Sequence, residues 1–131
     1  MSMNIPAMQQ AKLLCFNLSE QEWKILSRES EKLGAAPYRV EQTDFSQTLG
    51  ALLGILEREK KPCLSPFSEK MIIMSSFDKN NMERFLDSIK KDGVKIPYKA
   101  VITPTNLFWH CEDLIKELVK EHEQIRRKQE R

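Results

Sequence analysis

The sequence predicts an α/β fold in which four strands form one sheet packed by helices. Two short apolar runs, Leu13–Phe16 and Met71–Met74, each have the length of a buried strand and lead directly into a helix-start signal. Each helical segment that follows ends at a glycine, and a second strand and a second helix come after each glycine. The order βαβα followed by βαβα is typical of a layered α/β domain.

The two helix starts share one pattern of capping residues. Ser19 can cap the first helix while Glu22 closes a capping box, and Asp78 takes the place of Ser19 in the second half. Gly34 and Gly93 follow these caps at equal distances along the chain, where a left-handed residue commonly ends a helix. Apolar residues with helical spacing lie between these limits: Trp23, Leu26 and Leu33 in the first half, and Met82, Phe85, Leu86 and Ile89 in the second.

The similarity of the two halves continues after the glycines. The Pro-Tyr-basic segment at residues 37–39 corresponds to that at residues 97–99, and each begins a second predicted strand, over residues 38–42 and 99–103. A helix is then expected over residues 44–57, and its counterpart begins at Asn106 with a matching apolar stripe. A duplicated βαβα unit explains these shared features better than chance similarity between two α/β segments.

We expect a single domain over residues 1–131, built from two pseudo-repeats, 12–57 and 70–119, which a loop at 58–69 joins. Each half alone is too small for a stable core, so both halves should share one sheet. Right-handed crossovers favour parallel strands within each half. A ferredoxin-like α+β sheet, antiparallel and with extra helices, is the alternative, and the sequence leaves both open.

Composition excludes several classes of protein. The 131 residues are 40% hydrophobic, and 21 Lys and Arg against 19 Asp and Glu give a net charge of +2, which makes nucleic acid an improbable partner. No apolar run reaches the roughly 18 residues that a membrane span needs. The three cysteines form no CxxC pair and residues 1–10 do not resemble a signal peptide, so we predict a reduced, cytoplasmic protein.

Polar residues gather at the four predicted strand-to-helix junctions. If all strands are parallel, these junctions share one edge of the sheet, where α/β proteins bind ligands and helix N-termini attract anions. Capping preference alone explains the same residues, and neither GxxxxGK[ST] nor GxGxxG occurs. The candidate ligand-binding residues are Ser19, Asp44, Ser75, Ser76, Asp78, Thr103, Thr105 and Asn106.

Apolar side chains outside the expected core indicate an interaction surface. The helix over residues 44–57 is apolar on more than one face, so it is either deeply buried or in contact with another protein, and Gly50 and Gly54 indicate that it packs closely. Trp109 falls opposite the apolar stripe of the last helix, where it either packs on a neighbouring element or anchors a partner. The candidate interaction residues are Trp109, Leu49 and Leu53.

No catalytic or metal-binding constellation emerges from the sequence. His110 and His122 face different directions on the last helix and Cys111 lies on its apolar stripe, so no tetrahedral set of metal ligands is expected. Cys15 falls on a core position, and Cys63 has no basic neighbour that would activate its thiol. We therefore expect no catalytic residue, no metal and no cofactor.

One segment resembles a known family. It comprises the run Ala-Val-Ile-Thr-Pro-Thr-Asn at residues 100–106, Trp109, and the acidic helix that ends Glu-His-Glu at residues 121–123. These residues resemble a small uncharacterised bacterial family, a domain of unknown function in Gram-positive anaerobes. The resemblance covers residues 71–123, with a weaker echo across residues 12–56. It implies a compact cytoplasmic domain and transfers no activity and no catalytic residue.

The sequence thus favours a non-enzymatic module for protein interaction or self-association, whose partner is a second copy or an unidentified protein. The alternative is a domain that binds a nucleotide or an anion at the strand-to-helix junctions. An enzyme is less favoured because the chain has two histidines and unpaired cysteines as its main catalytic resources. Neither a membrane nor a nucleic acid is an expected partner.

Overall fold

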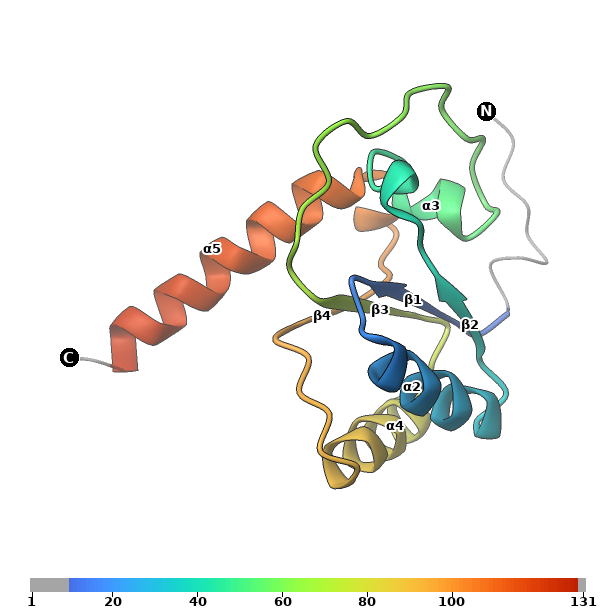
Figure 1. Ribbon diagram of the computed structural model, residues 1–131, viewed down its shortest axis with the longest axis vertical. Coiled ribbons are helices and arrows are strands. Elements are labelled where there is room, and N and C mark those ends of the chain that lie inside the picture. The colour runs from blue at the N-terminus through green and yellow to red at the C-terminus, as the bar shows by residue number, and fades with distance from the viewer. Residues whose placement is uncertain (1–9, 130–131) are drawn as a thin grey trace.

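The computed structural model describes residues 10–129, which form a four-stranded sheet with helices on both of its faces (Figure 1). This arrangement confirms the predicted α/β class. Residues 1–9 and 130–131 lie outside the described part. Residues 1–10, which do not resemble a signal peptide, therefore fall almost entirely outside it. The elements are β1 (Lys12–Phe16), α2 (Glu20–Lys32), β2 (Ala36–Arg39), η1 (Gln42–Asp44), α3 (Leu49–Leu52), β3 (Met71–Ser75), α4 (Lys79–Lys91), β4 (Tyr98–Val101), η2 (Asn106–Phe108) and α5 (Cys111–Gln129), where η denotes a 3₁₀ turn.

The sheet is mixed, with the strand order β2-β1-β3-β4. The pairs β1–β2 and β3–β4 are parallel, as the crossover rule predicts within each half. The two central strands are antiparallel, with Lys12 opposite Ser75 and Phe16 opposite Met71. The sheet is therefore neither all-parallel nor the antiparallel alternative. No helix connects the two halves, so the crossover that would make β1 and β3 parallel is not required.

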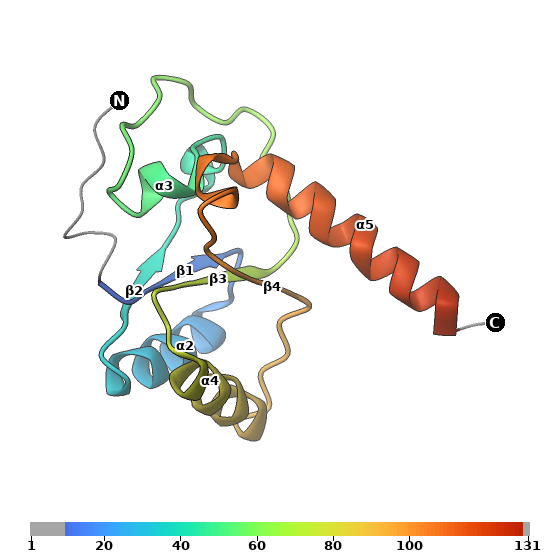
Figure 2. The same cartoon turned by 180° about the vertical axis from the view of Figure 1, so that it is seen from behind.

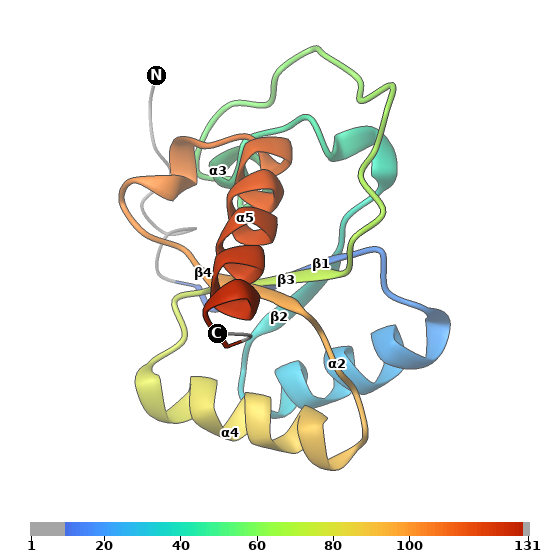
Figure 3. The same cartoon turned by 90° about the vertical axis from the view of Figure 1, so that its left-hand side faces the viewer.

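Both central strands are buried on both faces, which explains why they read as continuous apolar runs. Leu13, Cys15, Ile72 and Met74 face the layer of α2 and α4, which lie side by side (Figure 3). On the opposite face, a second cluster joins the sheet to α3, the first half of α5 and Phe67 from the connecting loop. Figure 2 shows from behind that this loop runs over the α3 side of the sheet. That second cluster includes Leu14, Phe16, Phe45, Leu49, Leu53, Met71, Ile73, Leu107, Cys111, Leu114 and Ile115.

The predicted helix limits are confirmed. Ser19 accepts a hydrogen bond from the backbone N–H of Glu22 and the Glu22 side chain accepts one from the N–H of Ser19, which completes the capping box. Asp78 caps α4 through the N–H of Asn81. The glycines after both helices have φ values of 77° and 79°. Asn17 after β1 and Ser76 after β3 also match, because both have a positive φ, of 61° and 60°. These correspondences agree with a duplication, which stays a prediction.

The predicted helix over residues 44–57 is wrong in its extent, since only Leu49–Leu52 is α-helical. Thr48 caps this short helix by accepting a hydrogen bond from the N–H of Ala51, so the helix begins there. Gly54, with φ of 78°, follows its end. The last helix similarly begins at Cys111 rather than at Asn106, and it continues through Gln129.

A two-residue bridge explains why both helices start where they do. The N–H of Leu49 donates to the carbonyl of Trp109 at 3.0 Å, and the N–H of Cys111 donates to the carbonyl of Gln47 at 3.0 Å. Thr48 and His110 therefore pair as an isolated antiparallel bridge. The backbone groups just before α3 and α5 are used in this pairing, so neither helix extends further toward its N-terminus.

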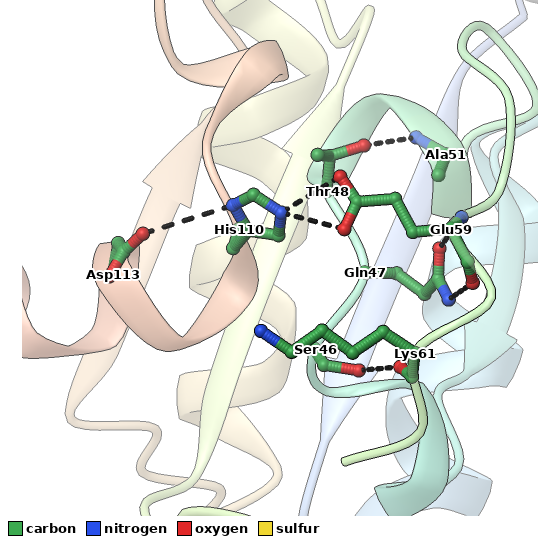
Figure 4. Close-up of polar contacts among 8 residues, drawn as sticks. All are labelled: Ser46, Gln47, Thr48, Ala51, Glu59, Lys61, His110 and Asp113. Atoms are coloured by element: carbon green, nitrogen blue, oxygen red, sulfur yellow. Dashed lines mark hydrogen bonds and ion pairs between the residues drawn. The ribbon is translucent and has the colours of Figure 1, made fainter.

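Gln47 extends this junction to the connecting loop (Figure 4). Its side-chain amide donates to the carbonyl of Glu59 at 2.7 Å and accepts from the N–H of Glu59 at 2.8 Å. The Glu59 carboxylate reaches His110 Nε2 at 2.9 Å, and the Ser46 hydroxyl donates to the carbonyl of Lys61. Gln47 is only 4% exposed, so its two hydrogen bonds are formed away from water and fix the loop firmly on α3.

The close packing predicted from Gly50 and Gly54 is found at Gly50 and not at Gly54, where a Cβ would meet nothing within 4 Å. A Cβ at Gly50 would lie 2.6 Å from Leu56 Cδ1 and 2.9 Å from the carbonyl oxygen of Leu107. The first atom can rotate away, whereas the second belongs to the backbone of η2. Gly50 therefore sets how closely α3 approaches η2.

We expect Gly50→Ala to destabilise the protein by about 2 kcal/mol, because the added methyl group forces α3 away from η2. Urea unfolding measures this change. Gly54→Ala is the control, since a Cβ there meets nothing within 4 Å and adds only the strain of its positive φ, about 1 kcal/mol. Equal losses of stability in the two variants would contradict the packing role of Gly50.

Candidate functional site

The mixed sheet divides the predicted junction residues between two opposite edges. The carboxyl ends of β1 and β2 lie at one edge, with Ser19 and Asp44, whereas those of β3 and β4 lie at the other. The four junctions therefore do not meet, as they would on an all-parallel sheet, because β1 and β3 run in opposite directions. The second edge receives the remaining candidates: Ser75, Ser76, Asp78, Thr103, Thr105 and Asn106.

The two predicted residues at the β1–β2 edge have structural partners. Ser19 belongs to the capping box, and Asp44 forms an ion pair with Arg58. Partial burial raises the pKa of the neighbouring Glu22 carboxyl, but the hydrogen bonds from Ser19 and Lys70 outweigh this and leave the pKa below its usual range. Glu22 is therefore an ionised cap rather than a proton donor at neutral pH.

Side chains of the protein occupy the β1–β2 edge itself. Asn17 donates from its amide to the carbonyls of Phe67 and Glu69, both at 2.9 Å, so the connecting loop is tied across the end of β1. Arg39 forms an ion pair with Glu20 at 2.7 Å, and its guanidinium lies 5.8 Å from the centre of the Trp23 ring. These residues leave a hollow of about 760 Å³ at this edge, and its walls are polar and apolar in similar proportion.

The β3–β4 edge instead holds a cavity of about 620 Å³ between the start of α4 and η2. Its walls are mostly apolar, and of the residues that the structure describes, Lys79 is the one charged residue in the lining. Phe108, 50% exposed, and Val101, 43% exposed, stand at its mouth. The lining consists of Ile55, Met74, Ser75, Ser76, Phe77, Lys79, Met82, Val101, Ile102, Thr103, Pro104, Leu107 and Phe108.

The cavity brings together three of the predicted ligand-binding residues, Ser75, Ser76 and Thr103. Asn106 shapes the wall instead. Its side-chain oxygen accepts from the N–H of Thr103 at 2.8 Å, and its N–H donates to the Thr103 hydroxyl at 3.0 Å. Asp78 caps α4, and Thr105 is exposed beside η2. The polar side chains at this edge thus mainly fix the loops that enclose an apolar space.

The apolar lining is the part that sequence reasoning missed. Met74 and Leu107 are core residues whose far ends reach the cavity, and Ile55 comes from the other half of the chain. Phe108 could have been predicted as a surface residue of interest, because it lies beside Trp109 in the segment that resembles the known family. Lys79 could not have been predicted from the sequence, since a lysine at the start of a helix is an ordinary surface residue.

Of the three predicted interaction residues, only Trp109 is exposed at the surface. Leu49 and Leu53 are 0% and 1% exposed and belong to the core on the α3 face. Trp109 is 37% exposed and lies before α5 in an extended conformation, so the helical wheel does not describe its direction. The apolar character of the segment after residue 44 is explained by burial, the first of the two readings.

The histidines and cysteines form no metal site within residues 10–129. His110 pairs with Glu59 across the junction of Figure 4, and Asp113 lies 3.9 Å from its other ring nitrogen. His122 packs its ring against Tyr98 with centres 5.4 Å apart. The two imidazoles therefore support the attachment of α5 at two separate places.

All three cysteines are free thiols, and two of them are buried. Burial raises the pKa of Cys15 from 9.0 to about 12, and the nearby Arg39 opposes this only in part. Burial also raises the pKa of Cys111 to about 12. Since the thiolate is the reactive form, both thiols are inert at neutral pH.

We expect only Cys63, which is half-buried, to react rapidly with a thiol reagent such as DTNB at pH 8, and all three cysteines to react in denaturant. Cys63→Ser should abolish the rapid phase. A rapid phase in Cys63→Ser would contradict this assignment.

The buried thiols of Cys15 and Cys111 also make the stability of the protein depend on pH. Because their folded pKa values exceed the unfolded ones, the stability that the two protonated thiols contribute is complete below pH 9 and is lost as the pH rises from 9 toward 12.

Comparisons with known proteins give one match. Neither the curated proteins nor the solved structures contain a match to the chain. No helix within residues 10–129 combines the length and the apolar character required to cross a bilayer. The match covers β3, α4, β4, η2 and most of α5, the elements that build the cavity except for Ile55. Residues 70–125 match the family described as a domain of unknown function (DUF3783), which confirms the family resemblance found in the sequence.

Proposed function

We propose that this protein is a binding module whose ligand occupies the cavity at the β3–β4 edge. The observation that carries the proposal is the cavity itself. Its volume of about 620 Å³ and its mostly apolar walls with a few polar groups are typical of small-molecule sites. Its position at the carboxyl ends of two parallel strands is where open α/β sheets commonly bind ligands.

The difference between the two edges supports this proposal. At the β1–β2 edge, the charged Arg39 and the polar Asn17 line a hollow whose walls are as polar as they are apolar. At the β3–β4 edge the cavity is left open although exposed apolar side chains border it, which is unfavourable unless another molecule covers them. Ile55 also comes from the first half, so the proposed site requires both halves in one domain.

The chemistry of the lining favours binding over catalysis. The lining offers hydroxyl groups and one ammonium group. Among the described residues, no histidine or carboxylate that could act as a general base lines the cavity. The three free cysteines agree with a reducing compartment, so we retain the cytoplasm as the proposed location.

Self-association through α5 is a second candidate function. The outer half of this helix, residues 120–129, is exposed and projects from the body of the molecule (Figure 1). Its first turn carries Glu112 and Asp113, and its last turn carries Arg126, Arg127 and Lys128. Two copies of α5 packed antiparallel would place these opposite charges together, with the exposed Ile125 available for apolar contact. The occupant of this surface is therefore a second copy of the chain.

The ligand-binding proposal is tested with N-phenyl-1-naphthylamine, a neutral apolar dye whose fluorescence rises in apolar surroundings. We expect the wild-type protein to bind it and Met82→Trp to bind it more weakly, because the larger indole occupies part of the cavity. Arg84→Trp is the control, since it adds the same side chain to an exposed part of α4 outside the lining. Unchanged binding in Met82→Trp, or none by the wild type, would contradict the proposal.

Self-association is tested by size-exclusion chromatography with light scattering. We expect a dimer whose fraction falls as salt is raised, and a monomer after Arg126→Glu with Arg127→Glu. Mixing that double variant with Glu112→Lys and Asp113→Lys should restore dimers, since the charges become complementary again. Circular dichroism verifies that α5 stays helical. A wild-type monomer at all concentrations would exclude this candidate.

A further inference from the structure

The two edges of the sheet place different side chains at corresponding positions. Glu20 and Lys79 are the first residues of α2 and α4, and Arg39 and Val101 are the last residues of β2 and β4. The fourth residue of each helix is Trp23 in α2 and Met82 in α4. The first edge thus has an ion pair above an aromatic ring, and the second has a lysine beside two apolar side chains.

Exchanging Arg39 for Val101 has two consequences at the β3–β4 edge. The smaller, apolar side chain lines the cavity, whereas at the other edge the arginine places its guanidinium 5.8 Å from the Trp23 ring centre. Val101 also carries no charge, so β4 places no charged side chain at the position that Arg39 has beside Glu20. Within residues 10–129, Lys79 has no ion pair and no side-chain hydrogen bond.

The nearest acidic side chain along the chain does not neutralise Lys79. Asp78 accepts hydrogen bonds from the backbone N–H of Asn81 at 2.7 Å and from its side-chain amide at 3.3 Å, so it is directed at its own helix. Among residues 10–129, no carboxylate lines the cavity. Within this part of the chain, a single cation therefore lies at the edge of an apolar space without a counter-ion.

We infer that the ligand of this cavity is an amphipathic organic anion, with its apolar body between Met82, Val101 and Leu107 and one anionic head against Lys79. This inference rests on the proposed function of the cavity and adds the chemical class of the ligand. A ligand of this class buries apolar surface where the walls are apolar and supplies the charge that Arg39 and Glu20 supply to each other at the other edge.

The number of charges distinguishes this class from a nucleotide. A di- or triphosphate carries several negative charges and is normally held by several cations or by a glycine-rich loop of backbone N–H groups. The described part of the lining supplies one cation, Lys79, and the neighbouring Asp78 would repel a multiply charged group. One carboxylate or one sulfonate on an apolar body is the charge that the site accommodates.

The inference is tested by NMR titration of the full chain with three probes of equal chain length: octanoate, octan-1-ol and octylammonium. We expect chemical-shift changes at Met82, Val101 and Leu107 with the first two probes, and octanoate to bind about fivefold more tightly than octan-1-ol because of the ion pair. Octylammonium should bind most weakly, since Lys79 repels it.

Two pairs of variants assign the effect to Lys79. Lys79→Met should remove the preference for octanoate and leave octan-1-ol binding unchanged, whereas Lys90→Met, on the same helix outside the lining, should change neither. Val101→Glu should supply an internal counter-ion, as Arg39 does for Glu20, and should weaken octanoate binding relative to octan-1-ol binding, whereas the uncharged Val101→Gln should weaken both to a similar extent. The NMR spectrum of each variant is compared with that of the wild-type protein, and a similar dispersion of chemical shifts verifies folding.

The outcomes separate the inference from the proposed function. Equal binding of octanoate and octan-1-ol, or an octanoate preference that survives Lys79→Met, would overturn the inference and leave the cavity as a neutral apolar site. Failure of every probe to perturb the lining residues would overturn both.

Discussion

The antiparallel pairing of β1 with β3 is the constraint on which the other elements depend. These two strands form the centre of the sheet, and every residue of β3 and all but the first of β1 are buried. Each strand then carries one parallel neighbour on its outer side. The two strand-helix-strand units lie antiparallel in one sheet, and the right-handed crossover that such units favour then places α2 and α4 on the same face, as observed.

This constraint also separates the two ends of the sheet that could bind a ligand. The same local plan, a strand followed by a left-handed residue and a capped helix, occurs once at each edge. At one edge Asn17 binds the connecting loop and Arg39 pairs with Glu20, so polar and charged side chains border the hollow there. At the other, Val101 and Lys79 line a mostly apolar cavity. A few side chains thus give two similar places a different chemical character.

The opposite face depends on buried polar side chains in an otherwise apolar layer. Gln47 and Ser46 bind backbone groups of the connecting loop, and the reciprocal bonds between residues 47–49 and 109–111 hold the starts of α3 and α5 together. A buried amide that lost these partners would cost about 1–3 kcal/mol, so the loop is an integral part of the fold and not a passive linker. The inner half of α5 is fixed here, which leaves its outer half free to project.

The sequence by itself determined the elements whose signals are local. The buried strands, the capping box of Ser19 and Glu22, the cap at Asp78 and the glycines that end α2 and α4 are short-range features, and the structure contains each of them. Only the tertiary structure decided the direction of β3 relative to β1, the shortness of α3 and the cavity. The first depends on pairing across the connecting loop, and the second on hydrogen bonds between residues far apart in the chain. The cavity arises where Ile55, Met82, Val101 and Leu107 converge from separate elements, and no local pattern records that convergence.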